Sequence, residues 1–333
     1  MSTYLIEKSL IKESNKNSQH SSEEFLKNNQ FFYRKKIFLD KLKSPTGKTK
    51  YKRYNGAPIR YAGGKSLAVG LIVELLPDNL DKIVSPFLGG GSVEVACENE
   101  LGIKVISYEI FNILVNYWKV QLKYPEELYK RLLKFEPTRE TFKMVKETLK
   151  KHWKGQEKLN KLDLAAYFYF NHNTSYGPHF LGWPSSVYLD DKCYKRIIDK
   201  VRNFKAPNMK VECASFEEIM SKHINDFLYC DPPYYLDGDS KTFIGMYPHR
   251  NFPIYHKGFK HEKLRDLLLN HKGGFILSYN DCSTIREWYK DFNMIAPNWQ
   301  YTFSQGDTRI GVNRLKNNNG SYIKKSHELL IWK

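Results

Sequence analysis

An acid, two prolines and a tyrosine directly follow the apolar run FLYC at 227–230. The run is typical of a buried parallel strand, and prolines must lie beyond its carboxyl end because they cannot donate to a sheet ladder. Asp231 and a backbone carbonyl held out by Pro232 and Pro233 can accept hydrogen bonds from an amine on an aromatic ring, which frees its lone pair for attack. Tyr234 can stack on that ring and align it with an electrophile. An ordinary proline turn is the alternative.

A second group combines glycines with an acid on the next strand. Gly89, Gly90 and Gly91 lie between a predicted strand and a predicted helix, where a ligand can approach the backbone closely. Glu109 ends the following strand, where a carboxylate can accept both hydroxyls of a ribose. The two features together favour a nucleoside site, although a tight turn alone would also explain the glycines.

The stretch RYAGGKS at 60–66 ends like a phosphate-binding loop. That motif requires glycine five positions before Gly64, where this chain has Ile59, so we reject a nucleotide triphosphatase. Gly63 and Gly64 can still line a ligand, with Lys65 supplying charge at the start of a helix.

Strands and helices alternate around these motifs from residue 56 onward, which predicts an α/β fold. Strand-like runs lie at 81–87, 104–109, 209–213, 226–230, 273–280, 300–304 and 328–333, with helical patterns at 65–76 and 92–101. Helical patterns dominate 119–204 and interrupt the alternation. We therefore expect a catalytic domain formed by 56–118 and 205–333, with 119–204 inserted.

Charge is the strongest feature of the composition. The 333 residues carry a formal net charge of +17, which favours a polyanionic partner, nucleic acid before membrane. Residues 1–55 hold about half of this excess and predict a basic extension outside the domain core, either a phosphate-contacting arm or a solvated leader.

Cysteine usage and hydropathy bear on the compartment. Five widely spaced cysteines without a Cys-x-x-Cys pair argue against a disulfide framework or zinc site and favour a reducing, cytoplasm-like compartment. The chain has no signal-like apolar start and no run of membrane-spanning length, so we expect no membrane association.

Five motifs in order resemble the Dam-type adenine-specific DNA methyltransferases: YAGGK, PFLGGGSVE, LYCDPPY, FILSYND and ELLIWK. The resemblance covers about residue 58 to the C-terminus. It implies S-adenosylmethionine as methyl donor, no metal, a Rossmann-like, mostly parallel sheet with a reversed last strand, and a helical target-recognition insertion. It places Asp231, Pro232, Pro233 and Tyr234 at the target adenine. The residues expected around the donor are Tyr61, Ala62, Gly63, Gly64, Lys65, Pro86, Phe87, Gly89, Gly90, Gly91, Ser92, Glu109, Ile110, Ser215, Phe216 and Asp231.

Two positions depart from the family pattern. Ser85 stands where an acid commonly precedes Pro-Phe, which puts contact with the donor's methionyl amine at that position in doubt. Ser215 replaces the acid of an Asp-Phe pair, while Phe216 is retained to flank the donor's adenine.

The insertion contains side chains suited to DNA. Asn171 and Asn173 can read an adenine edge, and His172, Tyr176, His179 and Trp183 offer stacking or wedge surfaces, with a packed aromatic hairpin as the alternative. The long polar segment after the catalytic loop supplies candidate phosphate contacts at Lys241, Arg250, Lys257 and Lys260. Ser278 and Tyr279, at the end of a later strand, either line the base pocket or pack in the core.

These features predict a DNA adenine-N6 methyltransferase that flips its target base out of the duplex and transfers the methyl group by in-line displacement. Two alternatives stay open: an adenine-N6 methyltransferase acting on RNA, and a catalytically silent DNA-binding subunit. Expected partners are double-stranded DNA and a cognate restriction endonuclease encoded nearby. The compartment would be the bacterial cytoplasm at the nucleoid, or a host cytoplasm if the protein is viral.

Overall fold

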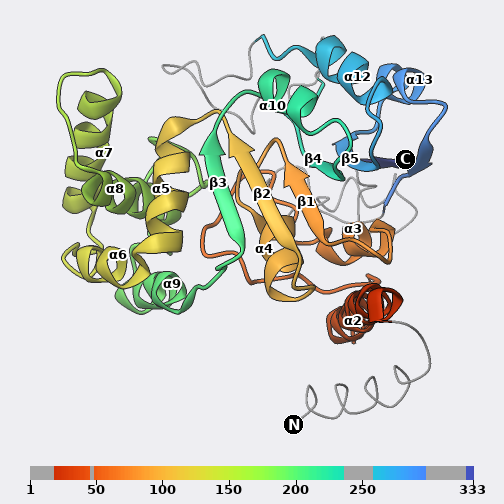
Figure 1. Ribbon diagram of the computed structural model, residues 1–333. Helices are drawn as coiled ribbons and strands as arrows, with labels where there is room; N and C mark the ends of the chain where they lie inside the picture. Colours follow the sequence, from red (N-terminus) through yellow and green to blue (C-terminus); the bar gives the residue numbers. More distant parts are fainter. Residues whose placement is uncertain (1–18, 46–48, 236–257, 298–327) are drawn as a thin grey trace, which may run out of the picture.

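The computed structural model describes residues 19–45, 49–235, 258–297 and 328–333. At its centre is a seven-stranded sheet with the order β3-β2-β1-β4-β5-β7-β6 (Figure 1). The strands are β1 (Lys82–Ser85), β2 (Lys104–Glu109), β3 (Met209–Cys213), β4 (Leu228–Cys230), β5 (Phe275–Asn280), β6 (Asn293–Ile295) and β7 (Glu328–Trp332). The five strands β1 to β5 run parallel to one another, whereas β7 is antiparallel to β5 and to β6. The predicted Rossmann-like sheet with a reversed last strand is confirmed.

The apolar strands are covered on both faces. Every residue of β4 and β5 is buried, and neighbouring residues alternate between two core clusters, as Ile276 and Leu277 do. The three-residue β6 was not predicted, because its partly exposed side chains leave no apolar run to detect. The predicted strand at 300–304 lies outside the described residues.

Helices close the two faces of the sheet. They include α3 (Val69–Leu75) and α4 (Ser92–Asn99) on one face, and α10 (Phe216–Lys222), α12 (His261–Leu269) and α13 (Ser283–Trp288) on the other. The chain passes from β1 outward to β2 and β3, then returns to place β4 on the opposite side of β1. The carboxyl ends of β1 and β4 therefore meet at a topological switch point, where open α/β sheets bind ligands.

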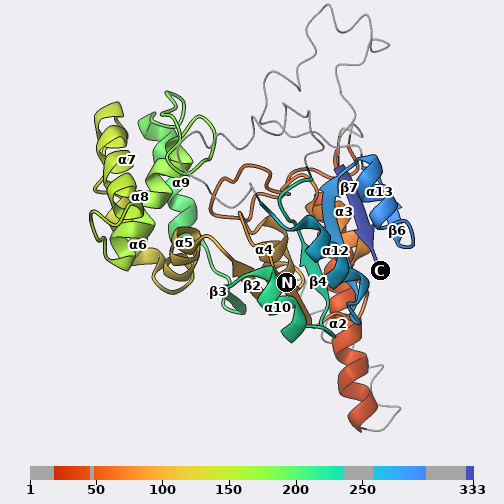
Figure 2. The same cartoon turned by 90° about the horizontal axis from the view of Figure 1, so that it is seen from above.

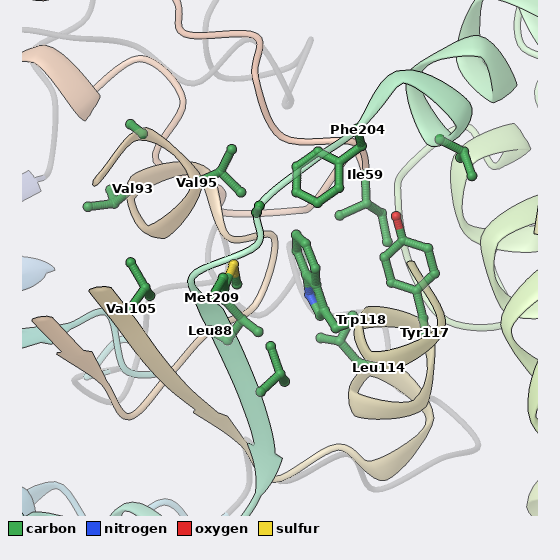
Figure 3. Packing of buried hydrophobic residues seen from close by; sticks show 14 of the residues in the cluster. Ile59, Leu88, Val93, Val95, Val105, Leu114, Tyr117, Trp118, Phe204 and Met209 are labelled. Atoms are coloured by element: carbon green, nitrogen blue, oxygen red, sulfur yellow. The ribbon is translucent and has the colours of Figure 1, made fainter. Parts of the chain in front are cut away.

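A block of helices stands beside the β3 edge of the sheet (Figures 1 and 2). It consists of α5 (Asn112–Lys123), α6 (Pro125–Leu132), α7 (Arg139–Trp153), α8 (Lys161–Thr174) and α9 (Asp191–Asn203). The boundary expected at 118/119 falls inside α5, which packs against both α8 and β3. Tyr117 and Trp118 of α5 point into a shared core with Phe204 and Met209 (Figure 3). The insertion is thus fused to the sheet through buried aromatic side chains.

The composition of the basic N-terminal segment predicts that it lies outside the domain core, but part of the segment is buried in that core. Helix α2 (Gln19–Leu42) packs on α3, and its Phe31, Phe38 and Leu42 are buried. Tyr51 is buried against Gly70 of α3, whose missing side chain makes room for the ring. The apolar residues among the lysines explain the difference. Their burial against α3 is favourable even though most residues of the segment are polar. Of the helices in the described ranges, none has the length and apolar character needed to cross a membrane.

Candidate active site

Loops at the carboxyl ends of β1, β2 and β4 surround a cavity of about 290 Å³. Its walls are formed by residues 61–65, 86–94, 109–111, 214–217, 229, 231–234 and 258–260. All the residues predicted to surround the donor and all four predicted catalytic residues line this cavity. Segments more than a hundred positions apart in the sequence are thus brought to one site, although the role of each residue stays a prediction.

The glycine loop needs its glycines. Gly89 and Gly91 have φ values of +48° and +64°, in the left-handed region that residues with a Cβ avoid. A Cβ on Gly90 would lie 2.4 Å from that of Tyr61, so this glycine allows the loop at 61–65 to pack directly on the 89–91 loop. Trp118 fixes the arrangement from the helical block by donating from Nε1 to the Gly89 carbonyl at 3.0 Å.

Glu109 connects β2 to the same loop. Its Oε2 accepts from the Gly89 amide at 3.1 Å, and its Oε1 accepts from the Phe111 amide at 3.0 Å. Burial raises the pKa of the Glu109 carboxyl, while these amides act against the shift. Each carboxylate oxygen has a further lone pair, so Glu109 can still accept from hydroxyl groups in the cavity.

Three phenyl rings form an apolar part of the wall. Phe87 lies 5.5 Å from Phe216 and 5.8 Å from Phe259, and the last two are 5.1 Å apart. Ser215 also lines the cavity, and its hydroxyl caps α10 by accepting from the Glu217 amide. Phe259 was missed, since it follows a long segment with no recognisable periodicity. The cluster provides a surface for a flat aromatic ring.

Asp231 lies at the end of β4 against Lys65. The Lys65 ammonium donates to Asp231 Oδ1 at 2.6 Å and lies 5.1 Å from the Tyr234 ring. Burial raises the pKa of Asp231, and the charge and hydrogen bond of Lys65 oppose that rise. Tyr234 is held from the other side, because its hydroxyl donates to Glu328 of β7. Lys65, Asp231 and Tyr234, which we call the catalytic corner, therefore place a carboxylate paired with a buried ammonium beside an aromatic ring held by a hydrogen bond.

Sequence reasoning also missed Glu94, on the first turn of α4. The side chain is buried, lines the cavity, and accepts a hydrogen bond of 2.6 Å from Ser85. Burial raises its pKa to about 8, although the Ser85 hydrogen bond opposes the shift. A carboxyl group is therefore present beside Ser85 in space, supplied by a different element. Glu94 could have been noticed as an acid within the apolar face of a predicted helix.

Three of the residues predicted to contact DNA are buried. Asn171 and Asn173, predicted to read an adenine edge, and His172, predicted to stack or wedge, lie in the last turn of α8, which favours the packed alternative for these side chains. The amide oxygen of Asn171 accepts from Leu181 N, and that of Asn173 accepts from Arg60 N. The rings of His172 and Tyr61 stack at 5.7 Å. The side-chain oxygens of Asn171 and Asn173 thus fasten the helix to its neighbours. His172 is held by ring packing, because within the described residues neither of its ring nitrogens has a hydrogen-bond partner.

Other predicted contacts of the insertion remain accessible. Tyr176 and Trp183 are 62% and 75% exposed, and the Tyr176 amide donates to the Trp183 carbonyl at 2.8 Å. Lys146 of α7 lies 4.6 Å from the Trp183 ring, while His179 is half-buried.

The candidates after the catalytic loop have mixed outcomes. Lys241, Arg250 and Lys257 lie outside the described residues. Lys260 lines the cavity and forms an ion pair of 3.0 Å with Glu217. Ser278 and Tyr279 are fully buried and do not line the cavity, so the packing alternative holds for both.

Sheet order and site together define a Rossmann-like methyltransferase fold. The sequence profile of the D12 class N6 adenine-specific DNA methyltransferases matches residues 61–303, and the chain belongs to this family. It is 27% identical over 296 residues to the type II methyltransferase M.FokI of Planomicrobium okeanokoites, covering 81% of this chain and 43% of that protein. It is 25% identical over 255 residues to the type II methyltransferase M1.LlaDCHI of Lactococcus lactis subsp. cremoris, covering 71% of this chain and 84% of that protein. The chain thus spans less than half the length of the M.FokI relative.

Proposed function

We propose that this protein transfers a methyl group from S-adenosylmethionine to N6 of adenine in double-stranded DNA. The observation that carries the proposal is the Lys65–Asp231–Tyr234 corner, which opens into the same cavity as the glycine loop and Glu109. Membership of the D12 class supports the reaction type.

The cavity walls match the chemistry of the donor. Phe87, Phe216 and Phe259 suit an adenine ring, Glu109 suits ribose hydroxyls, and the glycine loop allows close backbone approach. When bound, the donor would supply a methyl group already activated by attachment to a positively charged sulfur.

The catalytic corner suits an extruded adenine. Tyr234 would stack on the base, and Asp231 together with the Pro232 carbonyl would accept hydrogen bonds from its exocyclic amine. These acceptors keep the nitrogen lone pair out of the ring and aim it at the methyl carbon. Burial raises the pKa of Asp231, and the charge and hydrogen bond of Lys65 favour the ionised carboxylate against that effect. The proton released from nitrogen after transfer would pass to Asp231 or to solvent.

Duplex DNA would be held by the positively charged surface and the exposed rings of the insertion. The net charge of +17 suits phosphates, and Tyr176 and Trp183 present aromatic surface beside Lys146. Because the relatives are type II methyltransferases, we propose that a cognate restriction endonuclease recognises the same DNA sequence. We also propose that the protein acts in the compartment that contains the DNA, the bacterial cytoplasm at the nucleoid or a host cytoplasm.

A methyl-incorporation assay tests the proposal. Protein and labelled donor are incubated with duplex DNA or with transfer RNA, and modified adenine is identified by mass spectrometry. We expect label in duplex DNA as N6-methyladenine, and a loss of at least about 100-fold in Asp231→Ala. Asp281→Ala is the matched control, because Asp281 pairs with Arg286 at the surface and does not line the cavity.

Three results would contradict the proposal. Full activity in Asp231→Ala would remove the catalytic role. Label confined to transfer RNA would favour the RNA enzyme. DNA binding by a wild type that binds no donor would favour the silent subunit.

A further inference from the structure

Glu94 is a buried acid in the wall of the proposed donor cavity. Its side chain is 2% exposed, and Ser85 donates to its Oε1 at 2.6 Å. In the described part of the chain no cationic side chain forms an ion pair with Glu94. The charge of Lys65 acts on Glu94, but the Lys65 ammonium is paired with Asp231. A carboxyl group in this setting must either stay protonated or acquire a cation.

The surroundings favour the protonated form in the free protein. Burial raises the pKa of Glu94 to about 8, the charge of Asp231 adds to the rise, and Ser85 and Lys65 oppose it. The buried Cys97 thiol, one turn along α4, is the other titratable group that interacts with Glu94. At neutral pH the carboxyl is therefore mostly uncharged until a positive group enters the cavity.

Charged groups on the elements packed around α4 either pair with other groups or are exposed to solvent. Glu98 on the same helix accepts from the Asn208 amide. Glu109 on β2 accepts from two backbone amides. Glu74 on α3 pairs with Lys50, Lys82 on β1 pairs with Asp226, and Glu212 on β3 is exposed. Glu94 lines the cavity, and none of these neighbouring charged groups pairs with it.

We propose that Glu94 binds the ammonium group of the donor's methionyl part and loses its proton as the donor enters. This proposal rests on the proposed function and specifies one contact within it. The donor carries two positive groups, and the ammonium is the better partner because its N–H groups can donate hydrogen bonds to a buried carboxylate, whereas a sulfonium has none. The displaced proton leaves to solvent, so binding and ionisation are linked.

The linkage has a definite sign. Below the pKa of Glu94 in the free protein, binding must expel a proton, so affinity rises with pH. Between pH 6 and 7 the gain approaches about tenfold per unit. Near pH 8 Glu94 becomes ionised in the free protein and the donor's ammonium loses its proton, so affinity should reach its maximum there and fall at higher pH.

Titration calorimetry with S-adenosylhomocysteine tests the contact, because this product keeps the ammonium but has a neutral sulfur. We expect wild-type affinity to rise about tenfold from pH 6 to 7, with nearly one proton released in buffers of different ionisation enthalpy. Glu94→Gln keeps an acceptor for Ser85 but should bind with a flat pH profile and no proton release. Glu98→Gln, a buried neighbour on the same helix outside the cavity wall, should behave as wild type.

Two further measurements separate this role from a structural one. Ser85→Ala removes a group that lowers the pKa of Glu94, so the pH midpoint of binding should move upward while the slope persists. Methylthioadenosine, which lacks the amino acid portion, should bind wild type without the pH dependence.

A pH-independent wild-type affinity for S-adenosylhomocysteine, or an unchanged slope in Glu94→Gln, would overturn the proposal. A slope seen with S-adenosylmethionine but not with its product would reassign Glu94 to the sulfonium. Failure of the wild type to bind either compound at any pH would instead refute the proposed function. Thermal unfolding of each variant shows whether it is folded.

Discussion

The Lys65 ammonium donates a hydrogen bond of 2.6 Å to the Asp231 carboxylate, although 166 positions separate the two residues in the sequence. The contact joins the loop before α3 to the end of β4, and the Lys65 side chain is only 3% exposed. Because Lys65 is buried and the Asp231 side chain is only 20% exposed, the charge of Lys65 acts on the protonation of Asp231 more strongly than it would in water. The ionised form of the proposed catalytic acid therefore depends on a distant loop.

Replacing Lys65 by methionine should raise the pKa of Asp231, because burial would then act without the opposing positive charge. The carboxylate would be lost at higher pH than in wild type, so the acid limb of the kcat profile should move upward. We expect activity to fall by about tenfold or more at pH 6 and by less at pH 9. Lys50→Met, at an exposed pair with Glu74, should leave the profile unchanged. An unmoved acid limb in Lys65→Met would show that this pair does not control ionisation.

Tyr234 should separate stability from activity. Tyr234→Phe removes the hydroxyl that donates to buried Glu328 and should lower the free energy of unfolding by about 1–3 kcal/mol. The stacking ring remains, so kcat should stay within about tenfold of wild type. Tyr234→Ala also removes the ring, whose stacking on the base contributes about 1–3 kcal/mol. We expect kcat/KM to fall much more in Tyr234→Ala than in Tyr234→Phe. Denaturant titration and steady-state kinetics measure the two effects. Equal kinetic losses in both variants would exclude a stacking role.

Trp183 should serve DNA binding and not donor binding. It is 75% exposed beside Lys146, so its removal costs little core packing. We expect Trp183→Ala to weaken affinity for duplex DNA by about tenfold and to leave donor affinity unchanged. Leu133→Ala, at a 51% exposed apolar residue following α6, is the matched control. Fluorescence anisotropy with a labelled duplex measures the DNA affinity of both variants. Wild-type DNA affinity in Trp183→Ala would exclude this surface as a DNA contact.

His172 should make stability depend on pH. Burial lowers its pKa to about 3, with the charges of His179 and Arg60 adding to the shift. The unfolded chain takes up a proton near pH 6.5 while the folded protein does not, so stability falls as pH drops below that value. For this residue the loss by pH 5 is about 2 kcal/mol. His172→Phe keeps a ring against Tyr61, and its free energy of unfolding should fall less between pH 7 and 5. An equally steep fall in the variant would place the titration elsewhere.

Much of the site could be predicted from local pattern. The prolines after β4, the glycines after β1 and Glu109 after β2 each follow an apolar run, and parallel strands end at one edge of a sheet. Glu94 and Phe259 could not be predicted in the same way. The sequence shows Glu94 only as an acid among apolar helix residues and Phe259 only as a residue after a segment without periodicity. Neither pattern indicates that the residue lines the cavity.

The amino-acid sequence by itself determined the alternation of strands and helices, the residues at the strand ends and the excess of positive charge. These depend on hydrophobic periodicity and turn chemistry, which act over a few neighbouring residues. Only the tertiary structure decided that Asn171 and Asn173 are buried fasteners, that α2 joins the core, and that Ser85 and Glu94 share a hydrogen bond. Those outcomes depend on which distant surfaces pack together, because a polar side chain takes its role from the partners that burial brings within reach.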